Sequence, residues 1–224
     1  GRIRNSLTFW PRHQCGGEKM EPVAIPITEY GVAKFMLPGQ EQSGDQHLVC
    51  CSKTGILIAA IDGLGHGEEA ANAAAAATCV LKQEIEEPII SLVHLCHEKL
   101  RTTRGAVLSL ATVDPAHGMM TWLGVGNVQG VLLRGAPNGG APQELLLLRG
   151  GVVGGQLPSL QAAVLPVSSG DTLYFATDGV RSDFVESLSR LESPQRAADR
   201  IMQRYHSGTD DALVLVARLL GIRS

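Results

Sequence analysis

Residues 56–78 read ILIAAIDGLGHGEEAANAAAAAT, and this stretch decides the fold of the chain. Its apolar start at 56–61 has the length of a buried strand, and Asp62 follows at the C-terminal end. The glycines of the GLGHG turn let the backbone bend sharply and approach a bound group closely. The alanine-rich segment after the turn favours a helix. The stretch therefore predicts strand, turn and helix, with Asp62 facing out of the core.

Asp62 has two interpretations at this point. It could cap the helix of an ordinary strand-to-helix connection, where the glycines only satisfy turn geometry. It could instead bind a metal or a phosphate, with His66 beside it. A dinucleotide or P-loop site fits badly, because neither G-x-G-x-x-G nor G-x-x-x-x-G-K-[ST] occurs here. The choice depends on whether other carboxylates reach the same edge of the sheet.

Three other acidic positions lie next to predicted strands. Asp45 begins a strand at 45–51 that should pair antiparallel with 56–61, which places Asp45 and Asp62 at one edge. Asp178 follows a second apolar strand at 171–177, and Asp210 precedes the last strand, Ala212–Leu219.

Carboxylates that converge repel one another, and their pKa values rise. Divalent cations relieve this repulsion, and oxygen-only ligands favour Mg²⁺ or Mn²⁺. A pair of such ions can lower the pKa of a water and clamp a phosphoryl oxygen. The carboxylates Asp45, Asp62, Asp178 and Asp210 therefore predict a site of phosphoryl hydrolysis.

The remaining pattern predicts alternating secondary structure along the chain. We expect a β-hairpin at 23–37 around Tyr30-Gly31, helices from 67 to about 87 and from 88 to about 103, and an antiparallel meander of strands between 106 and 148. The glycine-rich stretch at 150–155 is either a mobile loop or a place where the backbone closely approaches a substrate. A short helix follows Ser182, and Ser193-Pro194 begins a helix that ends near residue 206.

Composition limits the classes of function. The 224 residues suit one domain, and a net charge of -3 gives no electrostatic case for nucleic acid or an anionic membrane. The five cysteines are odd in number and lack a C-x-x-C spacing, which indicates reduced thiols in the cytoplasm. We expect a cytoplasmic monomer with a single phosphatase domain at 22–221. Residues 1–21 are interpreted as an N-terminal extension, which is disordered, left over from expression, the product of an upstream start, or a docking tail.

Several motifs resemble those of the metal-dependent type 2C (PPM) serine/threonine phosphatases. The motifs are Asp62-Gly-Leu-Gly-His-Gly, Ala176-Thr-Asp178-Gly and Asp210-Asp211-Ala-Leu-Val-Leu-Val. Together with Ser43-Gly44-Asp45, Thr103-Arg-Gly-Ala106 and Gly126-Asn127, they follow the order of the bacterial RsbX-like phosphatases that reset the stressosome. The resemblance covers about residues 22–219. It implies an α+β fold, a β-sandwich of two antiparallel sheets flanked by pairs of α-helices, with the metals at one end.

The resemblance also implies roles for individual residues. Two Mn²⁺ or Mg²⁺ ions would be bridged by Asp62, with the Gly63 carbonyl completing one shell, while Asp45, Asp178 and Asp210 hold the ions directly or through waters.

Other residues are assigned secondary roles. Asp211 would orient its neighbour or bond nearby backbone, and Asp183 is the candidate for a third metal. His66 would donate a proton to the leaving seryl oxygen, or would only shape the turn. Arg104 and Arg181 are the weaker candidates for phosphate binding and are interpreted as surface cations.

The implied activity is that of a protein-serine/threonine phosphatase acting on phosphorylated STAS-domain scaffold and antagonist proteins. The segment before residue 171 is too short for a large flap, which leaves an open cleft suited to a folded substrate. Two other hypotheses stay open, a catalytically inactive binding module with this fold and a hydrolase of small phosphoesters.

Overall fold

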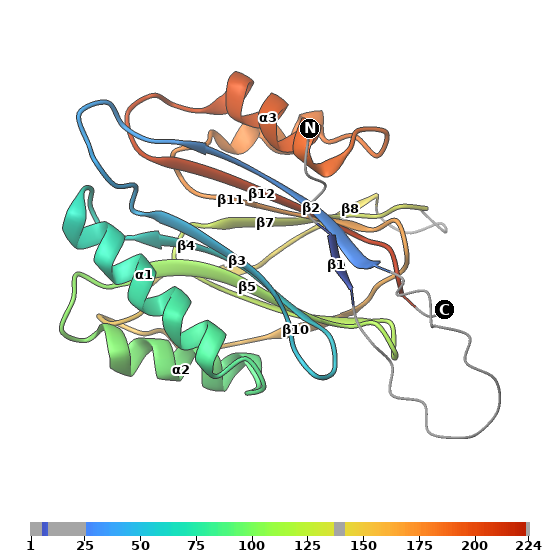
Figure 1. Ribbon diagram of the computed structural model, residues 1–224, viewed down its shortest axis with the longest axis horizontal. Helices are drawn as coiled ribbons and strands as arrows, with labels where there is room; N and C mark the ends of the chain where they lie inside the picture. Colours follow the sequence, from blue (N-terminus) through green and yellow to red (C-terminus); the bar gives the residue numbers. More distant parts are fainter. Residues whose placement is uncertain (1–5, 9–25, 137–141, 223–224) are drawn as a thin grey trace.

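The computed structural model describes residues 6–8, 26–136 and 142–222, which form two packed sheets with helices on their outer faces (Figure 1). Sheet 1 has the order β1 (Ser6–Thr8), β2 (Pro26–Phe35), β12 (Ala212–Leu219), β11 (Thr172–Ala176), β7 (Gln129–Leu133), β8 (Gln143–Leu145). Sheet 2 has the order β10 (Ala163–Pro166), β6 (Met119–Val125), β5 (Ala106–Asp114), β4 (Ile56–Gly63), β3 (Asp45–Cys51), with β9 (Leu148–Arg149) beside β6.

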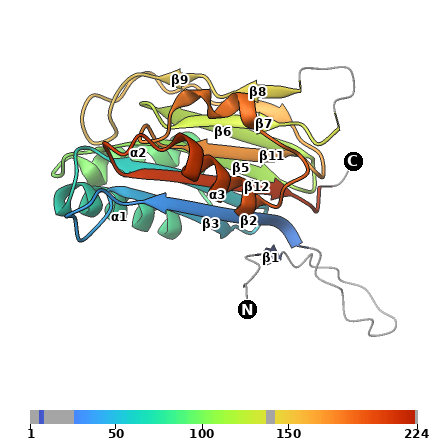
Figure 2. The same cartoon turned by 90° about the horizontal axis from the view of Figure 1, so that it is seen from above.

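The helices lie outside the two sheets. Helices α1 (Glu68–Gln83) and α2 (Ile89–Leu100) cover sheet 2, and α3 (Pro194–Tyr205) covers sheet 1 (Figures 1 and 2). A 3-10 helix, η1 (Ser182–Ser187), precedes α3. All strand pairs are antiparallel except β6 with β9. The α+β sandwich of antiparallel sheets is therefore confirmed, although 3-10 helix η1 stands where a second α-helix was expected on sheet 1.

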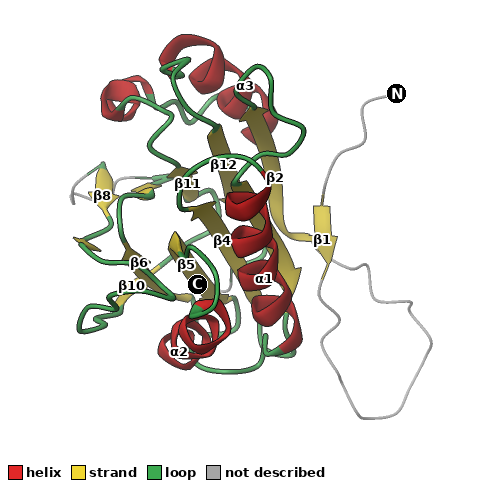
Figure 3. Cartoon of the chain, turned by 90° about the vertical axis from the view of Figure 1, so that its left-hand side faces the viewer, coloured by secondary structure: helices red, strands yellow, loops and turns green. Residues whose placement is uncertain are grey.

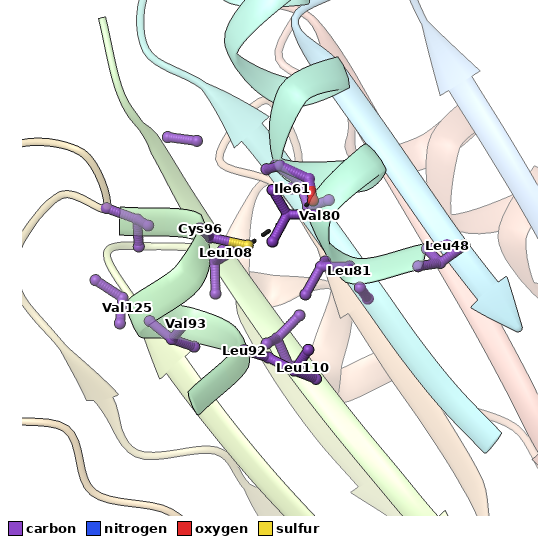
Figure 4. Packing of buried hydrophobic residues seen from close by; sticks show 14 of the residues in the cluster. Leu48, Ile61, Val80, Leu81, Leu92, Val93, Cys96, Leu108, Leu110 and Val125 are labelled. Carbon is purple, nitrogen blue, oxygen red and sulfur yellow. Dashed lines mark hydrogen bonds between the residues drawn. The ribbon is translucent and has the colours of Figure 1, made fainter. Parts of the chain in front are cut away.

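The continuous apolar run of β4 is explained by burial on both faces. Leu57 and Ile61 contact the helix layer, whereas Ile56 and Ile58 face sheet 1. Because successive side chains of a strand alternate between faces, a strand covered on both sides needs no polar positions. Figure 4 shows the helix side of this core, where the Cys96 thiol lies 3.8 Å from a backbone carbonyl of α1.

The helices end where the chain leaves the core. Helix α1 ends at Gln83, four residues before the predicted end, and the Glu84 backbone N–H caps the Val80 carbonyl. Helix α2 begins directly after Pro88, and Ser193 caps α3 by accepting a hydrogen bond from an N–H of its first turn. None of the helices in the described part of the chain is long and apolar enough to cross a membrane.

The predicted hairpin around Tyr30-Gly31 is wrong. Residues 26–35 form one continuous strand that pairs with β12 from Phe35–Ala212 to Thr28–Leu219. Gly31 serves close packing instead of a turn, since a Cβ there would lie 2.3 Å from the backbone of Gln195 in α3. The first part of the predicted hairpin, residues 23–25, lies outside the described residues.

The predicted meander is also wrong beyond its first hairpin. Strands β5 and β6 pair in sheet 2, but the chain then crosses at Gly126 to sheet 1, where β7 pairs with β11 and β8. Gly126 has φ +95°, a backbone conformation that glycine adopts without strain. The crossing separates neighbouring strands into different sheets and brings residue 127 to the edge between them.

The glycine-rich stretch at 150–155 packs on α2. Its Val153 bridges Ala106, and the Gly154 N–H donates a hydrogen bond of 3.0 Å to His97 Nδ1. A Cβ on Gly154 would lie 2.6 Å from Leu100. The close backbone approach seen here is to α2, and approach to a substrate stays a prediction. At the other end of the chain Ser6–Thr8 pairs with β2, while the rest of residues 1–21 lies outside the described residues.

Candidate metal centre

The carboxylates of Asp45 and Asp62 lie at one end of the sandwich, as their strand positions predict. The two residues are direct partners in the antiparallel β3–β4 ladder, so both meet at the edge where β4 leads into α1. This end of the molecule faces the viewer in Figure 3.

Sheet 1 delivers two further acidic residues to the same end. Asp178 lies two residues after β11, and Asp210 lies two residues before β12. Strands β11 and β12 are antiparallel neighbours that bring these ends together, with Ala176 opposite Val214. The centre is therefore assembled from both sheets.

Thr177 joins the two halves of the centre. Its buried hydroxyl donates a hydrogen bond of 2.7 Å to Asp45 Oδ2 and accepts one of 2.8 Å from the Leu213 N–H. The bond to Asp45 connects a residue that follows β11 in sheet 1 with the first residue of β3 in sheet 2. A hydroxyl with both a donor and an acceptor partner fixes the orientation of the carboxylate.

Asp178 is oriented by Asn127. The Asn127 amide Nδ2 donates a hydrogen bond of 2.8 Å to Asp178 Oδ2. Asn127 directly follows Gly126, where the chain crosses between the sheets. The crossing therefore places the Asn127 amide beside Asp178, where it orients the carboxylate.

Burial and mutual repulsion raise the pKa values of the two carboxyls of sheet 2. The pKa of Asp62 rises from 3.8 to about 8, first because the group is buried and then because Asp45, Asp178, Asp210 and Asp211 are negative. The pKa of Asp45 rises to about 7, again mainly through burial, although its bond from a hydroxyl acts in the opposite direction. A cluster with such values needs positive charge before all of its members ionise at neutral pH.

The donor set fits hard divalent cations. The Asp62 carboxylate accepts no hydrogen bond from any described residue, so its oxygens are available to a cation or a water. Within the described ranges no group of three or more His, Cys, Asp or Glu side chains converges closely enough to hold a metal ion by itself. Mg²⁺ and Mn²⁺ suit a site where waters supplement the carboxylates, because they take oxygen ligands and Mg²⁺ in particular keeps several waters.

Asp211 binds backbone rather than facing the centre. Its Oδ2 accepts a hydrogen bond of 2.7 Å from the Gly44 N–H, and its Oδ1 accepts one of 2.8 Å from the Leu37 N–H. The side chain is buried and fixes the loop that leads into Asp45. Bonding to backbone is one of the two roles expected of Asp211, and the neighbouring Asp210 accepts a hydrogen bond of 2.8 Å from the Asp211 N–H.

The turn after Asp62 depends on glycine. The Gly63 N–H donates to the Gly44 carbonyl at 3.1 Å, and a Cβ on Gly63 would lie 2.0 Å from the carbonyl oxygen of Ala70 in α1. Helix α1 can therefore lie this close to Gly63 only because Gly63 has no side chain. His66, in the same turn, is exposed and makes no hydrogen bond with the described part of the chain.

Asp183 lies apart from the acidic cluster. It is exposed on η1 and forms an ion pair of 3.4 Å with Arg181. It is not among the charges that raise the pKa of Asp45 or Asp62. The same ion pair occupies Arg181. The assignment of a third metal to Asp183 stays a prediction.

Arg104 lies against the GLGHG turn. A Cβ on Gly65 would lie 2.6 Å from Arg104 Nη1, and the same guanidinium pairs with Glu69 in the first turn of α1. The backbone also connects these segments, because the Leu64 N–H donates to the Gly105 carbonyl at 3.0 Å. Arg104 therefore contacts and stabilises the turn. This role was not part of its interpretation as a surface cation.

Sequence reasoning missed three supporting residues. Asn127 and Thr177 lie inside the motifs Gly126-Asn127 and Ala176-Thr-Asp178-Gly, but no individual role was assigned to them; their place in a motif was the signal available. Lys34 gave no such signal. Its ammonium donates a hydrogen bond of 2.9 Å to the Asp45 backbone carbonyl, and burial lowers its pKa despite the nearby carboxylates.

Known proteins share this architecture. The model of the family described as stage II sporulation protein E (SpoIIE) matches residues 52–220. The phosphoserine phosphatase RsbX of Bacillus subtilis (strain 168) is 22% identical over 182 residues, which is 81% of this chain and 89% of RsbX.

Solved structures extend the similarity to three dimensions. One, described as "The bacterial stressosome: a modular system that has been adapted to control secondary messenger signaling", is 30% identical with a TM-score of 0.76 and covers 85% of this chain and 99% of its own. A crystal structure of RsbX in complex with magnesium is 21% identical with a TM-score of 0.76 and covers 86% and 95%, respectively. The residues matched by the family model include β4, β11 and β12, whereas β3 with Asp45 lies before them.

Proposed function

The chain belongs to the stage II sporulation protein E (SpoIIE) family of type 2C serine/threonine phosphatases, and we propose that it dephosphorylates phosphoserine or phosphothreonine on STAS-domain signalling proteins of the stressosome type. The observation that carries this proposal is the convergence of Asp45, Asp62, Asp178 and Asp210 at one end of the sandwich, with the pKa of Asp62 raised to about 8. The similarity to RsbX and to a structure described with the stressosome supports the substrate class.

The acidic cluster is the proposed site of two Mn²⁺ or Mg²⁺ ions. When bound, such ions lower the pKa of a water and neutralise charge on the phosphoryl oxygens. Asp62 would hold the ions, as the resemblance to type 2C phosphatases implies, and its carboxylate accepts no hydrogen bond from any described residue. The Gly63 carbonyl, Asp45, Asp178 and Asp210 would complete the shells, directly or through waters.

The protein's own side chains prepare the reaction. Thr177 and Asn127 hold the carboxylates of Asp45 and Asp178 in fixed orientations, which reduces the reorganisation needed when substrate binds. His66 lies exposed in the turn after Asp62 and would give a proton to the leaving seryl Oγ. No covalent intermediate with the protein is part of this scheme.

We place this activity in the cytoplasm. The net charge of -3 offers nothing to nucleic acid or an anionic membrane surface.

The test is a phosphatase assay with purified protein, Mn²⁺ or Mg²⁺, and two substrates, a phosphorylated STAS-domain protein and p-nitrophenyl phosphate. We expect Asp62→Asn and Asp178→Asn to lower kcat by roughly 100-fold or more, since each removes a charge from the ion site. The matched control is Asp199→Asn on the exposed face of α3, which should keep wild-type activity.

Each hypothesis predicts a different result. Activity that survives both changes contradicts the assigned site, and turnover of the small ester alone favours a hydrolase of small phosphoesters. A protein that binds the phosphoprotein without turning over either substrate is a binding module.

A further inference from the structure

A groove of about 450 Å³ lies beside the proposed centre, between β7, β8 and η1. Its lining includes Gln129 and Val131 of β7, Leu145 of β8, and Ser182 and Val185 of η1. Figure 2 shows β8 at the margin of the molecule, next to β7. The groove shares no lining residue with the acidic cluster.

Both walls of the groove continue directly from the centre. On one wall Gln129 lies two residues after Asn127, whose amide holds Asp178. On the other wall Ser182 lies four residues after Asp178 itself. The groove therefore adjoins, along both walls, segments that also supply the centre.

The floor of the groove is apolar and its edge is open. Val131 is fully buried beneath it, whereas Leu145 is 65% exposed although it is a large apolar side chain. Strand β8 is the last strand of sheet 1, so its outer backbone groups have no partner strand in the described structure. An open strand edge beside exposed apolar side chains is a common site for adding a peptide segment.

The rim of the groove is acidic. Asp183 and Glu186 both line it and both are exposed. Arg181 pairs with Asp183, whereas Glu186 forms no ion pair with any described residue. Gln129 adds a buried Oε1 that has no hydrogen-bond donor in the described part of the chain. The groove therefore offers negative charge and a spare acceptor, which favour an occupant with a positive charge and N–H donors.

We propose that this groove binds the segment of the phosphoprotein substrate that flanks the phosphorylated residue. The inference rests on the proposed function. An apolar side chain of the segment contacts Leu145 and Val131, and a lysine or arginine of the segment pairs with Glu186.

The test compares kcat and KM for a phosphorylated STAS-domain protein and for p-nitrophenyl phosphate in two groove variants, Leu145→Asp and Glu186→Lys. We expect each to raise KM for the phosphoprotein by roughly tenfold, the effect of losing one central contact, while the constants for the small ester stay at wild-type values. Matched controls are Val164→Asp, a 58% exposed apolar position on β10 of the other sheet, and Glu98→Lys on α2.

A substrate variant sharpens the result. Replacing the basic residue of the phosphoprotein segment by glutamate should weaken its turnover by the wild-type enzyme and restore it with Glu186→Lys. The inference is overturned if both groove variants keep the wild-type KM for the phosphoprotein, or if they change it no more than the controls do. It is also overturned if Leu145→Asp changes the oligomeric state, because the groove would then hold a second copy. A wild-type enzyme that turns over only the small ester instead refutes the proposed function.

Discussion

Neutralising Asp62 should stabilise the protein in the absence of metal while abolishing its catalysis. The folded-state pKa of Asp62 is about 8 against an ordinary value of 3.8. Between about pH 4 and pH 8 the folded state therefore keeps a proton that the unfolded state has lost. Protonated Asp62 therefore contributes its full stabilisation below its unfolded-state pKa. This contribution is lost as the pH rises through its folded-state pKa.

The size of the effect follows from the shift. A change of about four pKa units corresponds to at most about 6 kcal/mol at the top of this window. Asn at position 62 carries no charge but still needs partners for its amide, which offsets part of the gain. We expect Asp62→Asn to raise the free energy of unfolding of the metal-free protein at pH 8 by about 1–3 kcal/mol, and to change it little at pH 4.

The assay is urea unfolding after treatment with a chelator, at pH 4, 6 and 8, with Asp199→Asn as the control. The control changes an exposed carboxyl of α3 in the same way and should leave the pH profile unaltered. Added Mn²⁺ should stabilise the wild type by about 3 kcal/mol at 100 times its Kd, and the Asp62→Asn variant by much less. If the variant is less stable than the wild type at pH 8 without metal, the destabilisation assigned to burial and repulsion of the Asp62 charge is wrong.

Three further outcomes test the supporting contacts. Thr177→Val should lower the free energy of unfolding by about 2–3 kcal/mol in urea, because Asp45 loses its buried donor, and Thr177→Ser should restore most of it. Asn127→Ala should raise the metal concentration for half-maximal activity by roughly 10- to 100-fold in a metal titration with little change in thermal stability, and an unchanged titration would exclude its positioning role. Gly31→Ala should destabilise the fold by about 1–3 kcal/mol, since its Cβ would lie 2.3 Å from the backbone of α3, whereas Gly150→Ala, with open space around it, should have no effect on the melting temperature.

The acidic pair of sheet 2 could be predicted from the sequence because local signals agree there. An apolar run, a carboxylate and a glycine turn each indicate the end of β4, and antiparallel pairing then fixes the position of Asp45 opposite Asp62. The order of the motifs gave the family and the fold. Each of these inferences depends on residues close together in sequence or on a pattern repeated along the chain.

What the sequence could not show depends on distant packing. Tyr30-Gly31 has the composition of a turn, but the glycine is needed by a helix that lies more than 160 residues later. The change of sheet at Gly126 could not be predicted either, because a hairpin and a crossing between sheets can both use a glycine with positive φ. Lys34 and Arg104 acquire their positions only when remote segments meet, so their roles followed from contacts alone.

The hydrogen bond from Thr177 to Asp45 has a consequence for control of the enzyme. Two carboxylates of the proposed centre belong to each layer of the sandwich, so the distances among them are set by how one layer sits on the other. A small slide of the layers would alter the ligand geometry without disturbing any single loop. A protein that binds both sheets at once could therefore activate or inhibit turnover from outside the cleft, by changing the alignment of the sheets.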